Sequence, residues 1–341
     1  MATIAAPLPR ADARPRAIAA WLIGIAALVF AMVVVGGITR LTESGLSITR
    51  WDVVSGTLPP LSDAEWQRQF GLYQQSSQYQ LMNRGMSLAE FKGIFFWEYV
   101  HRLLGRMVGA AFALPLLWFW LRRQIPAGYK PRLIALFALG GLQGAIGWWM
   151  VASGLVNRTE VAHERLAIHL ANALLIMAGC LWTALDLREG DARRSDRPQS
   201  WVTPMALILA VQIIWGAFTA GLRAGHVSDT WPLMLGALVP AGLFTAVSDA
   251  ISDPLTVHFI HRSMAWLVAL TALASATMLW RAGAGKRALA LGVMVLVQFV
   301  LGVSVVVNGV PVWLGVAHQA GAALLLASVV WAAHWSLRGR A

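Results

Sequence analysis

Four histidines stand inside apolar segments of this sequence, where ionisable side chains are costly and usually serve a function. In chain order they form two pairs, His101 with His169 and His261 with His318. Two neutral imidazoles that face each other across a helical bundle can bind the iron of a haem from both sides. Interhelical hydrogen bonds are the alternative, but they do not explain why both pairs recur in similar surroundings. We therefore expect two haem-sized sites with all four histidines as axial iron ligands.

The surroundings of these histidines repeat along the chain, which indicates an internal duplication. Small residues and threonines of the first apolar segment also recur in the fifth. The matched elements are Glu98-Tyr99-Val100-His101-Arg102 with His258-Phe259-Ile260-His261-Arg262, residues 142–147 (containing Gln143) with 297–302 (containing Gln298), residues 167–173 with 316–322, and Gly36, Thr39 and Gly45 with Gly216, Thr219 and Gly225.

One position differs between the repeats in a way that matters for chemistry. Glu98, one helical turn before His101, is replaced by His258 before His261. A carboxylate beside a bound haem can transfer protons or stabilise positive charge on a substrate carbon. The first half is therefore predicted to be reactive, with Glu98, His101 and His169 as catalytic residues. A structural ion pair between Glu98 and Arg102 is the alternative.

Several other polar residues receive simpler interpretations. Arg102 and Arg262 directly follow a predicted ligand and are expected to pair with haem propionates, because arginine binds carboxylates through two hydrogen bonds. Gln143 and Gln298 are expected to bond a neighbouring helix or a haem edge. His258 is expected either to donate a hydrogen bond beside the site or, as favoured, to lie in the membrane interface. Structural roles are expected for His163, His226, His334 and Cys180. Because Cys180 is the single cysteine, an intrachain disulfide and a cysteine-ligated cluster are excluded.

The composition shows which elements position these residues. Of 341 residues, 58% are hydrophobic and 13% charged, a balance typical of membrane proteins rather than soluble domains. About 20 apolar residues cross a bilayer as a helix. Eight segments are apolar enough to qualify: 17–38, 94–121, 133–151, 166–187, 202–222, 255–280, 288–307 and 312–335. The net charge of +11 is spread over short connections between them, so we expect no nucleic-acid partner.

The distribution of arginine and lysine predicts the orientation in the membrane. With the N-terminus in the cytoplasm, sixteen of them fall in cytoplasmic segments and eight in outer segments. Cytoplasmic loops normally carry this excess, so both termini are expected in the cytoplasm, and the first span is an uncleaved anchor. All four ligand histidines then lie near the outer face.

The predicted fold is an all-α integral membrane protein of two tandem four-helix bundles related by a parallel repeat. Its parts are a leader at 1–16, an N-terminal bundle at 17–188, a linker at 189–201, a C-terminal bundle at 202–336 and a tail at 337–341. A long outer loop at 40–92 contains an amphipathic stretch at 63–73. This loop is expected to be either a mobile lid over the outward-facing site or an ordered cap.

These motifs resemble those of haem A synthases, especially the type found in mitochondria and related proteobacteria. The resemblance rests on Glu98-Tyr99-Val100-His101-Arg102, Arg165–Leu170, Phe259-Ile260-His261-Arg262 and Ala317-His318-Gln319-Ala320, and it extends from Gly36 through the last span. Some bacterial members carry a cysteine pair in the first outer loop, and this chain has none there.

The resemblance implies oxidation of the C8 methyl group of haem O to the formyl group of haem A, which terminal oxidases use. It implies haem b at His261 and His318, substrate haem O at His101 and His169, and an essential glutamate at Glu98. It also suggests a bacterial inner-membrane location, with haem O synthase and an unidentified electron donor or acceptor as partners. The alternatives are a di-haem b electron-transfer cytochrome and a haem transporter or chaperone.

Overall fold

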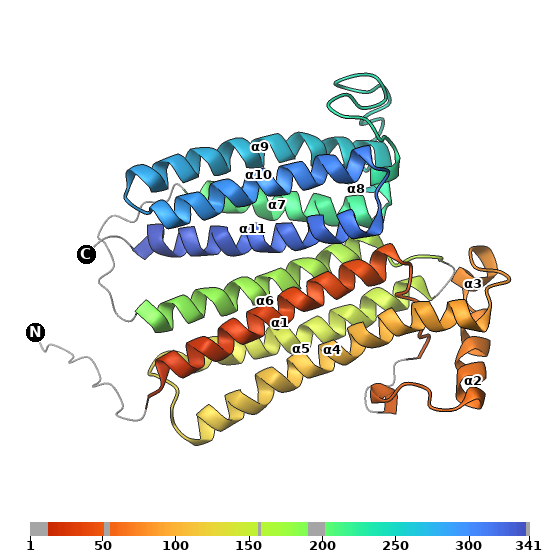
Figure 1. Cartoon of the computed structure of the whole chain (residues 1–341), viewed down its shortest axis with the longest axis horizontal. Coiled ribbons are helices and arrows are strands. Elements are labelled where there is room, and N and C mark those ends of the chain that lie inside the picture. The colour runs from red at the N-terminus through yellow and green to blue at the C-terminus, as the bar shows by residue number, and fades with distance from the viewer. Residues whose placement is uncertain (1–12, 51–54, 156–157, 190–201, 339–341) are drawn as a thin grey trace, which may run out of the picture.

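The computed structural model describes residues 13–50, 55–155, 158–189 and 202–338, and these residues form helices joined by loops (Figure 1). The predictions for most of the leader, the linker and the tail lie outside these residues. Within the described residues, eight helices are long and apolar enough to cross a membrane, as the sequence predicts. They are α1 Pro15–Leu41, α4 Leu88–Leu121, α5 Lys130–Gly154, α6 His163–Glu189, α7 Val202–Gly221, α9 Pro254–Arg281, α10 Gly285–Val307 and α11 Val312–Arg338.

The eight helices pack in two groups of four. Helix α1 packs on α4 and α6 while α5 packs on α6, and in the second group α7, α9, α10 and α11 pack on one another (Figure 1). Each group has its own buried apolar core, and Cys180 is fully buried in the first. The groups meet where α1 contacts α11 and where α6 contacts α7 and α11. The parallel repeat itself stays a prediction.

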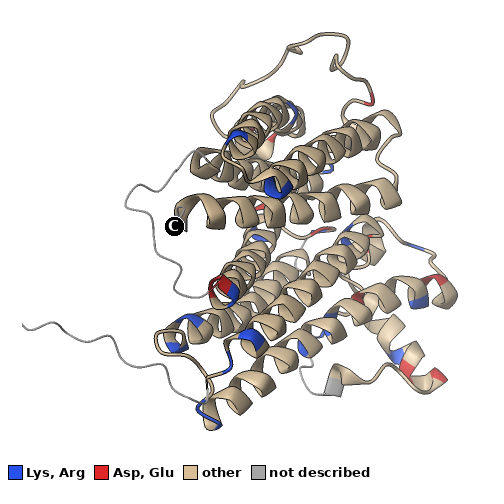
Figure 2. Ribbon diagram, turned by 60° about the vertical axis from the view of Figure 1, so that its left-hand side comes forward, with Lys and Arg blue, Asp and Glu red and all other residues tan. Residues whose placement is uncertain are grey.

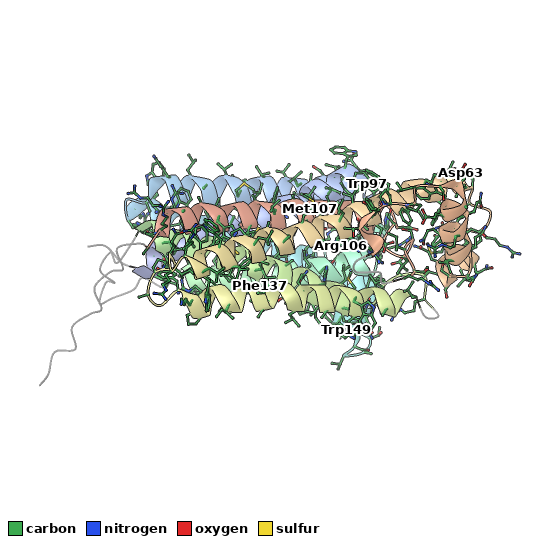
Figure 3. The ribbon with its side chains drawn as sticks, turned by 90° about the horizontal axis from the view of Figure 1, so that it is seen from below. Asp63, Trp97, Arg106, Met107, Phe137 and Trp149 are labelled. Atoms are coloured by element: carbon green, nitrogen blue, oxygen red, sulfur yellow. The ribbon has the colours of Figure 1, made fainter. Side chains whose placement is uncertain are left out.

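Apolar side chains cover the outward surfaces of the peripheral helices. Met107 on α4 is 54% exposed, and Phe137 and Trp149 on α5 are also exposed (Figure 3). Charged residues gather toward the helix ends (Figure 2). Because lipid tails favour apolar side chains and exclude charges, this surface suits a hydrocarbon environment.

The described parts of the connection between α1 and α4 form a cap beyond one end of the helices, called here the capped end (Figure 1). It contains the short helices η1 Ser55–Thr57, α2 Asp63–Gln74 and α3 Ser77–Leu81, so the amphipathic stretch is helical as predicted. Phe70 and Tyr73 form a buried cluster with Phe91 and Phe95 of α4. Burial raises the pKa of the Tyr73 phenol, which donates a hydrogen bond to Gln78 over 3.0 Å. This packing describes a cap, and movement as a lid stays a prediction.

Helix α4 begins six residues before the predicted span because of a local signal. The Ser87 side chain accepts a hydrogen bond from the Glu90 amide, and the Glu90 carboxylate accepts one from the Ser87 amide. This capping box satisfies amide donors that a helix start leaves unpaired. It begins α4 in the cap and continues the same helix past Glu98 and His101, so cap and site are rigidly connected.

Ionic contacts join the two helix groups at both ends. At the capped end, Arg40 donates to Glu160 over 2.7 Å, and Arg223 pairs with both Glu160 and Glu43. At the opposite end, fully buried His334 on α11 lies 3.1 Å from the Asp186 carboxylate on α6. The structural role expected for His334 fits this position.

Candidate functional site

Each of the four predicted ligand histidines packs against a glycine of a neighbouring helix. A Cβ atom added to any of these glycines would lie 2.9–3.0 Å from the Cε1 atom of the histidine ring, closer than nearly all Cβ contacts in proteins. The bare backbone therefore fixes the position of each imidazole. The pairs are Gly36 of α1 with His101 of α4, Gly147 of α5 with His169 of α6, Gly216 of α7 with His261 of α9, and Gly302 of α10 with His318 of α11.

This arrangement gives a role to four glycines whose contact with the histidines is not evident from the sequence. The sequence shows Gly36 and Gly216 only as a matched pair, and Gly147 and Gly302 only as parts of matched segments. Their recurrence one helix before each histidine was the signal that could have identified them. The contact itself joins two helices, so it is seen only once the three-dimensional positions of both helices are known.

His261 and His318 face each other with geometry that suits a metal between them. Their ring centres lie 6.4 Å apart and the ring planes are nearly perpendicular, at 89°. An imidazole nitrogen bonds a metal ion at about 2.0–2.1 Å and the ring centre lies about 1 Å behind it, so rings on opposite sides of one ion have centres about 6 Å apart. The second pair therefore fits a haem iron with two axial histidines.

His101 and His169 are held in the corresponding way in the first group. His169 lies within range of a direct electrostatic interaction with His101. The Nδ1 atom of His101, like that of His261, is buried without a hydrogen-bond partner among the described residues. The structure thus brings the members of each predicted pair together. Among the described residues, no three or more histidine, cysteine or acidic side chains gather as a metal-binding group, so each site consists of two histidines.

A glutamine amide lies over one histidine ring in each group. Gln143 Nε2 is 3.2 Å from Nδ1 and 3.3 Å from Nε2 of His169, and it donates to the His169 carbonyl over 3.0 Å. Gln298 repeats this arrangement at His318. Because the amide is nearly equidistant from both ring nitrogens, it sits over the ring rather than in its plane. Of the two alternatives predicted for these glutamines, bonding to a neighbouring helix is present.

The oxygen atoms of the two glutamines have different environments. Gln143 Oε1 accepts a hydrogen bond from Asn172 over 2.7 Å. Gln298 Oε1 is buried without a partner among the described residues, and it lies against Gly321, which corresponds to Asn172 in the repeat. The first group thus fixes its glutamine more firmly than the second.

Glu98 is buried, 3% exposed, and its carboxylate accepts hydrogen bonds on both oxygens. Arg102 donates to Oε1 over 2.6 and 3.1 Å. The Ser47 hydroxyl and the Ile48 amide each donate to Oε2 over 2.7 Å. The predicted alternative of a Glu98–Arg102 ion pair is therefore present. The two donors from the cap segment go beyond a simple pair, because they also fix the direction of the carboxylate.

Both arginines that follow a ligand histidine hold the backbone of a loop at the capped end. Arg102 donates to the carbonyls of Ile48 and Arg50 over 2.8 and 2.9 Å. Arg262 donates through Nη2 to carbonyls of residues 230, 232 and 233 over 2.9–3.2 Å, while its Nη1 is buried without a hydrogen bond among the described residues. Binding of a propionate is thus better supported for Arg262 than for Arg102.

The expectation for His258 is wrong in one respect. Its side chain is 1% exposed, so it is enclosed by the protein and does not project into the membrane interface. Its place on α9, at the position that Glu98 has on α4, explains the burial. His163 is also buried and lies 2.8 Å from the Ile251 carbonyl, while His226 belongs to the short helix η2 Ala224–His226. Neither lies in a histidine pair.

The two groups touch close to both sites. Gln319, next to His318 on α11, donates to the Val33 carbonyl of α1 over 2.7 Å. A Cβ atom on Gly37 would lie 3.2 Å from this glutamine side chain, and the neighbouring Gly36 packs against His101. Two consecutive glycines of α1 therefore contact both halves of the site.

Comparison with known proteins identifies the family of this chain. Residues 19–330 match the family model COX15-CtaA, described as "Cytochrome oxidase assembly protein". The chain belongs to this family. Proteins named "Heme A synthase" are similar over nearly their whole length. The one from Rhizorhabdus wittichii is 51% identical over 98% of this chain and 97% of its own. Those from Novosphingobium aromaticivorans and Parvibaculum lavamentivorans are 49% and 48% identical, with 96–98% of each chain covered.

Proposed function

We propose that the protein is a haem A synthase, which oxidises the C8 methyl group of haem O to a formyl group. The family match and the name shared by its relatives support the overall reaction. One structural observation carries the chemical assignment. Of the two histidine pairs, only the first has a buried carboxylate, that of Glu98, one helical turn from a ligand histidine. The reaction is therefore assigned to the first half.

In this proposal the two pairs have different occupants. His101 and His169 hold haem O as substrate, and His261 and His318 hold haem b as cofactor. Haem b, when bound, supplies one-electron transfer. The 6.4 Å separation of the His261 and His318 ring centres supports an iron at that pair, and the unpaired Nη1 of Arg262 provides a donor for a propionate.

Glu98 acts on the methyl carbon in two successive oxidations, which pass through an alcohol and then a hydrate that loses water. Each oxidation passes two electrons to the proposed electron acceptor, adds the oxygen of one water molecule to the carbon and releases two protons, so positive charge develops near the carbon. A buried carboxylate stabilises such charge strongly because little water screens it. Arg102, Ser47 and the Ile48 amide hold the carboxylate in one orientation, and the Ser47 hydroxyl is able to relay a proton from it.

The capped end is assigned to the outer side of a bacterial inner membrane, with both termini in the cytoplasm. The excess of basic residues on the other side supports this orientation. Haem O then reaches the site from within the membrane, where a haem O synthase and an electron donor or acceptor are the proposed partners.

The decisive experiment is haem extraction and mass analysis after expression with and without a supply of haem O. Wild-type protein should yield haem A only when haem O is supplied. Glu98→Ala should keep haem b, because the second histidine pair is untouched, and should accumulate haem O or the alcohol.

Glu90→Gln is the matched control, since Glu90 lies two turns earlier on the same helix and is exposed. It should make haem A normally. A normal haem A yield from Glu98→Ala would refute the catalytic assignment. Two haems b in the wild-type protein, whatever haem is supplied, would favour an electron-transfer cytochrome. Weak exchangeable haem in both halves would favour a transporter.

A further inference from the structure

A second long loop at the capped end, residues 227–248, differs in chemistry from the cap. It connects η2 with the short helix α8 Asp249–Ser252. From Thr230 to Ser248 it contains no charged residue and no histidine, although acidic residues flank it at both ends. A loop in water normally carries polar and charged side chains, so this stretch is unusual for one.

Met234 of this loop is buried, but most of its other large apolar side chains are exposed. The exposed fraction is 98% for Val247 and 71% for Leu238. Exposed apolar patches on this scale mark interaction surfaces. The other exposed apolar side chains of the loop are Trp231, Leu233, Leu235, Val239 and Phe244.

The base of the loop is fixed against the side of α9 and α10. Arg262 holds three of its carbonyls. Trp231 stacks on Trp266 of α9 with ring centres 6.0 Å apart, and its edge meets Phe299 of α10 at 6.2 Å. Trp266 is 50% exposed and belongs to the apolar outer surface of the helices. The loop therefore continues the surface that faces lipid.

These contacts also fix the depth of the loop. Helix α10 has 23 residues, which at 1.5 Å per residue is about 35 Å, slightly more than the hydrocarbon thickness of about 30 Å. Phe299 lies eight residues before the end of α10 at Val307, or about 12 Å along the axis. Trp231 is thus anchored at the depth of one leaflet.

The position of the loop in the fold agrees with this depth. It projects sideways from the helices, beside the first turns of α9 and the last turns of α10 (Figures 1 and 2). The helices α2 and α3 of the cap instead lie beyond the helix ends, where Figure 1 shows them furthest along the axis. One loop therefore extends into the plane of a membrane and the other extends away from it.

We propose that residues 230–248 dock into the membrane leaflet at the capped end, at the boundary between headgroups and acyl chains. Irregular backbone is excluded from the hydrocarbon centre because its polar groups lack partners there. At the boundary, water still reaches the backbone while apolar side chains enter the acyl region by about 5–10 Å. A hydrogen bond from the Thr245 hydroxyl lowers the pKa of Asp249. A charged carboxylate at this position places the end of the loop in water. This role is separate from the proposed reaction.

The test uses spin labels on cysteines introduced into the full chain, reconstituted in phosphatidylcholine nanodiscs. Cys180→Ala removes the native thiol, which is buried. Labels are placed by Val247→Cys in the loop, Leu61→Cys in the cap and Leu270→Cys on the outer face of α9, all at exposed positions. Collisions with oxygen report lipid, and collisions with a water-soluble nickel chelate report water.

The oxygen-to-nickel collision ratio at 247 is expected to be several-fold above that at 61 and to approach that at 270. A ratio at 247 equal to that at 61 would place the loop in water and overturn the proposal. Low collisions with both reagents, with dipolar broadening that dilution by unlabelled protein removes, would show a second copy covering the loop and would also overturn it.

A charge variant gives a second readout that does not depend on activity. Leu238→Glu in the chain labelled at 247 should lower the oxygen-to-nickel ratio there, because a carboxylate is costly in the acyl region. Leu61→Glu is the matched control and should leave that ratio unchanged. An unchanged ratio in Leu238→Glu would count against docking. Retention of wild-type haem absorption in each variant shows that the fold is intact.

Discussion

The two halves of the molecule share a frame for holding a histidine pair but differ in what surrounds it. In both, a glycine positions each histidine, a glutamine amide covers one ring, and an arginine after the first histidine anchors a loop. Only the first half has a buried carboxylate with two loop donors, and the second has His258 at that position. We therefore infer that the shared glycines, glutamines and arginines serve haem binding, and that the difference between Glu98 and His258 determines which half is reactive.

The largest effects are expected from removing one histidine of each pair, because the two removals should have different consequences for haem b. His261→Ala should remove haem b and abolish haem A formation, because one axial ligand is lost from the cofactor pair. His101→Ala should abolish haem A formation while haem b stays bound. The absorption spectrum and the extracted haems measure both results. Equal loss of haem b in the two variants would contradict the assignment of one haem to each half.

Glycine substitutions should produce the next largest effect. Gly302→Ala places a Cβ atom 3.0 Å from the His318 ring, so haem b occupancy should fall severalfold. Gly147→Ala should instead lower haem O turnover and leave haem b in place.

Controls for these variants lie on the same helices. An added Cβ on Gly292 of α10 meets only ordinary contacts, and one on Gly140 of α5 meets nothing within 4 Å. Gly292→Ala and Gly140→Ala should therefore retain normal haem content. If they lose as much haem as the site variants, helix packing in general is responsible rather than the histidine contact.

A smaller effect is expected at Ser47, which acts through Glu98. A hydrogen bond to a charged group contributes about 1.5–3 kcal/mol, so Ser47→Ala should slow methyl oxidation about tenfold or more. Haem b content should stay unchanged, and haem O should accumulate relative to haem A. Ser47→Thr keeps the hydroxyl and should restore most of the rate. Loss of haem b in Ser47→Ala would indicate a structural role instead.

The smallest effect is expected from a substitution that gives the first half the residue found at the matching position of the second. Asn172→Gly should leave the Gln143 oxygen unpaired, as the Gln298 oxygen is beside Gly321. The unpaired buried acceptor should cost about 1–3 kcal/mol, measured as a lower midpoint of thermal unfolding. Haem b should be retained, because the change lies outside the second pair. A variant as stable as wild type would show that this hydrogen bond does not distinguish the halves.

The sequence predicted the spans well because apolar length is a local property. All eight were found, and their ends shifted by a few residues where a capping signal such as Ser87 with Glu90 extended a helix. The pairing of His261 with His318 was predictable because depth follows from position along each span. The roles of Ser47 and the glycines, and the hydrogen bonds of Arg102 to the cap backbone, were not, because each depends on a contact between segments far apart in the chain. The burial of His258 was missed for the same reason.

The two consecutive glycines of α1 have a consequence for communication between the halves. Gly36 lies against one proposed iron ligand, while Gly37 lies against the residue that follows another. If each half binds a haem as proposed, an electron could pass between them along a short path through α11 and α1 that crosses the Gln319–Val33 hydrogen bond. A larger side chain at Gly37 would displace Gln319, lengthen this path and slow electron transfer between the haems without removing an iron ligand.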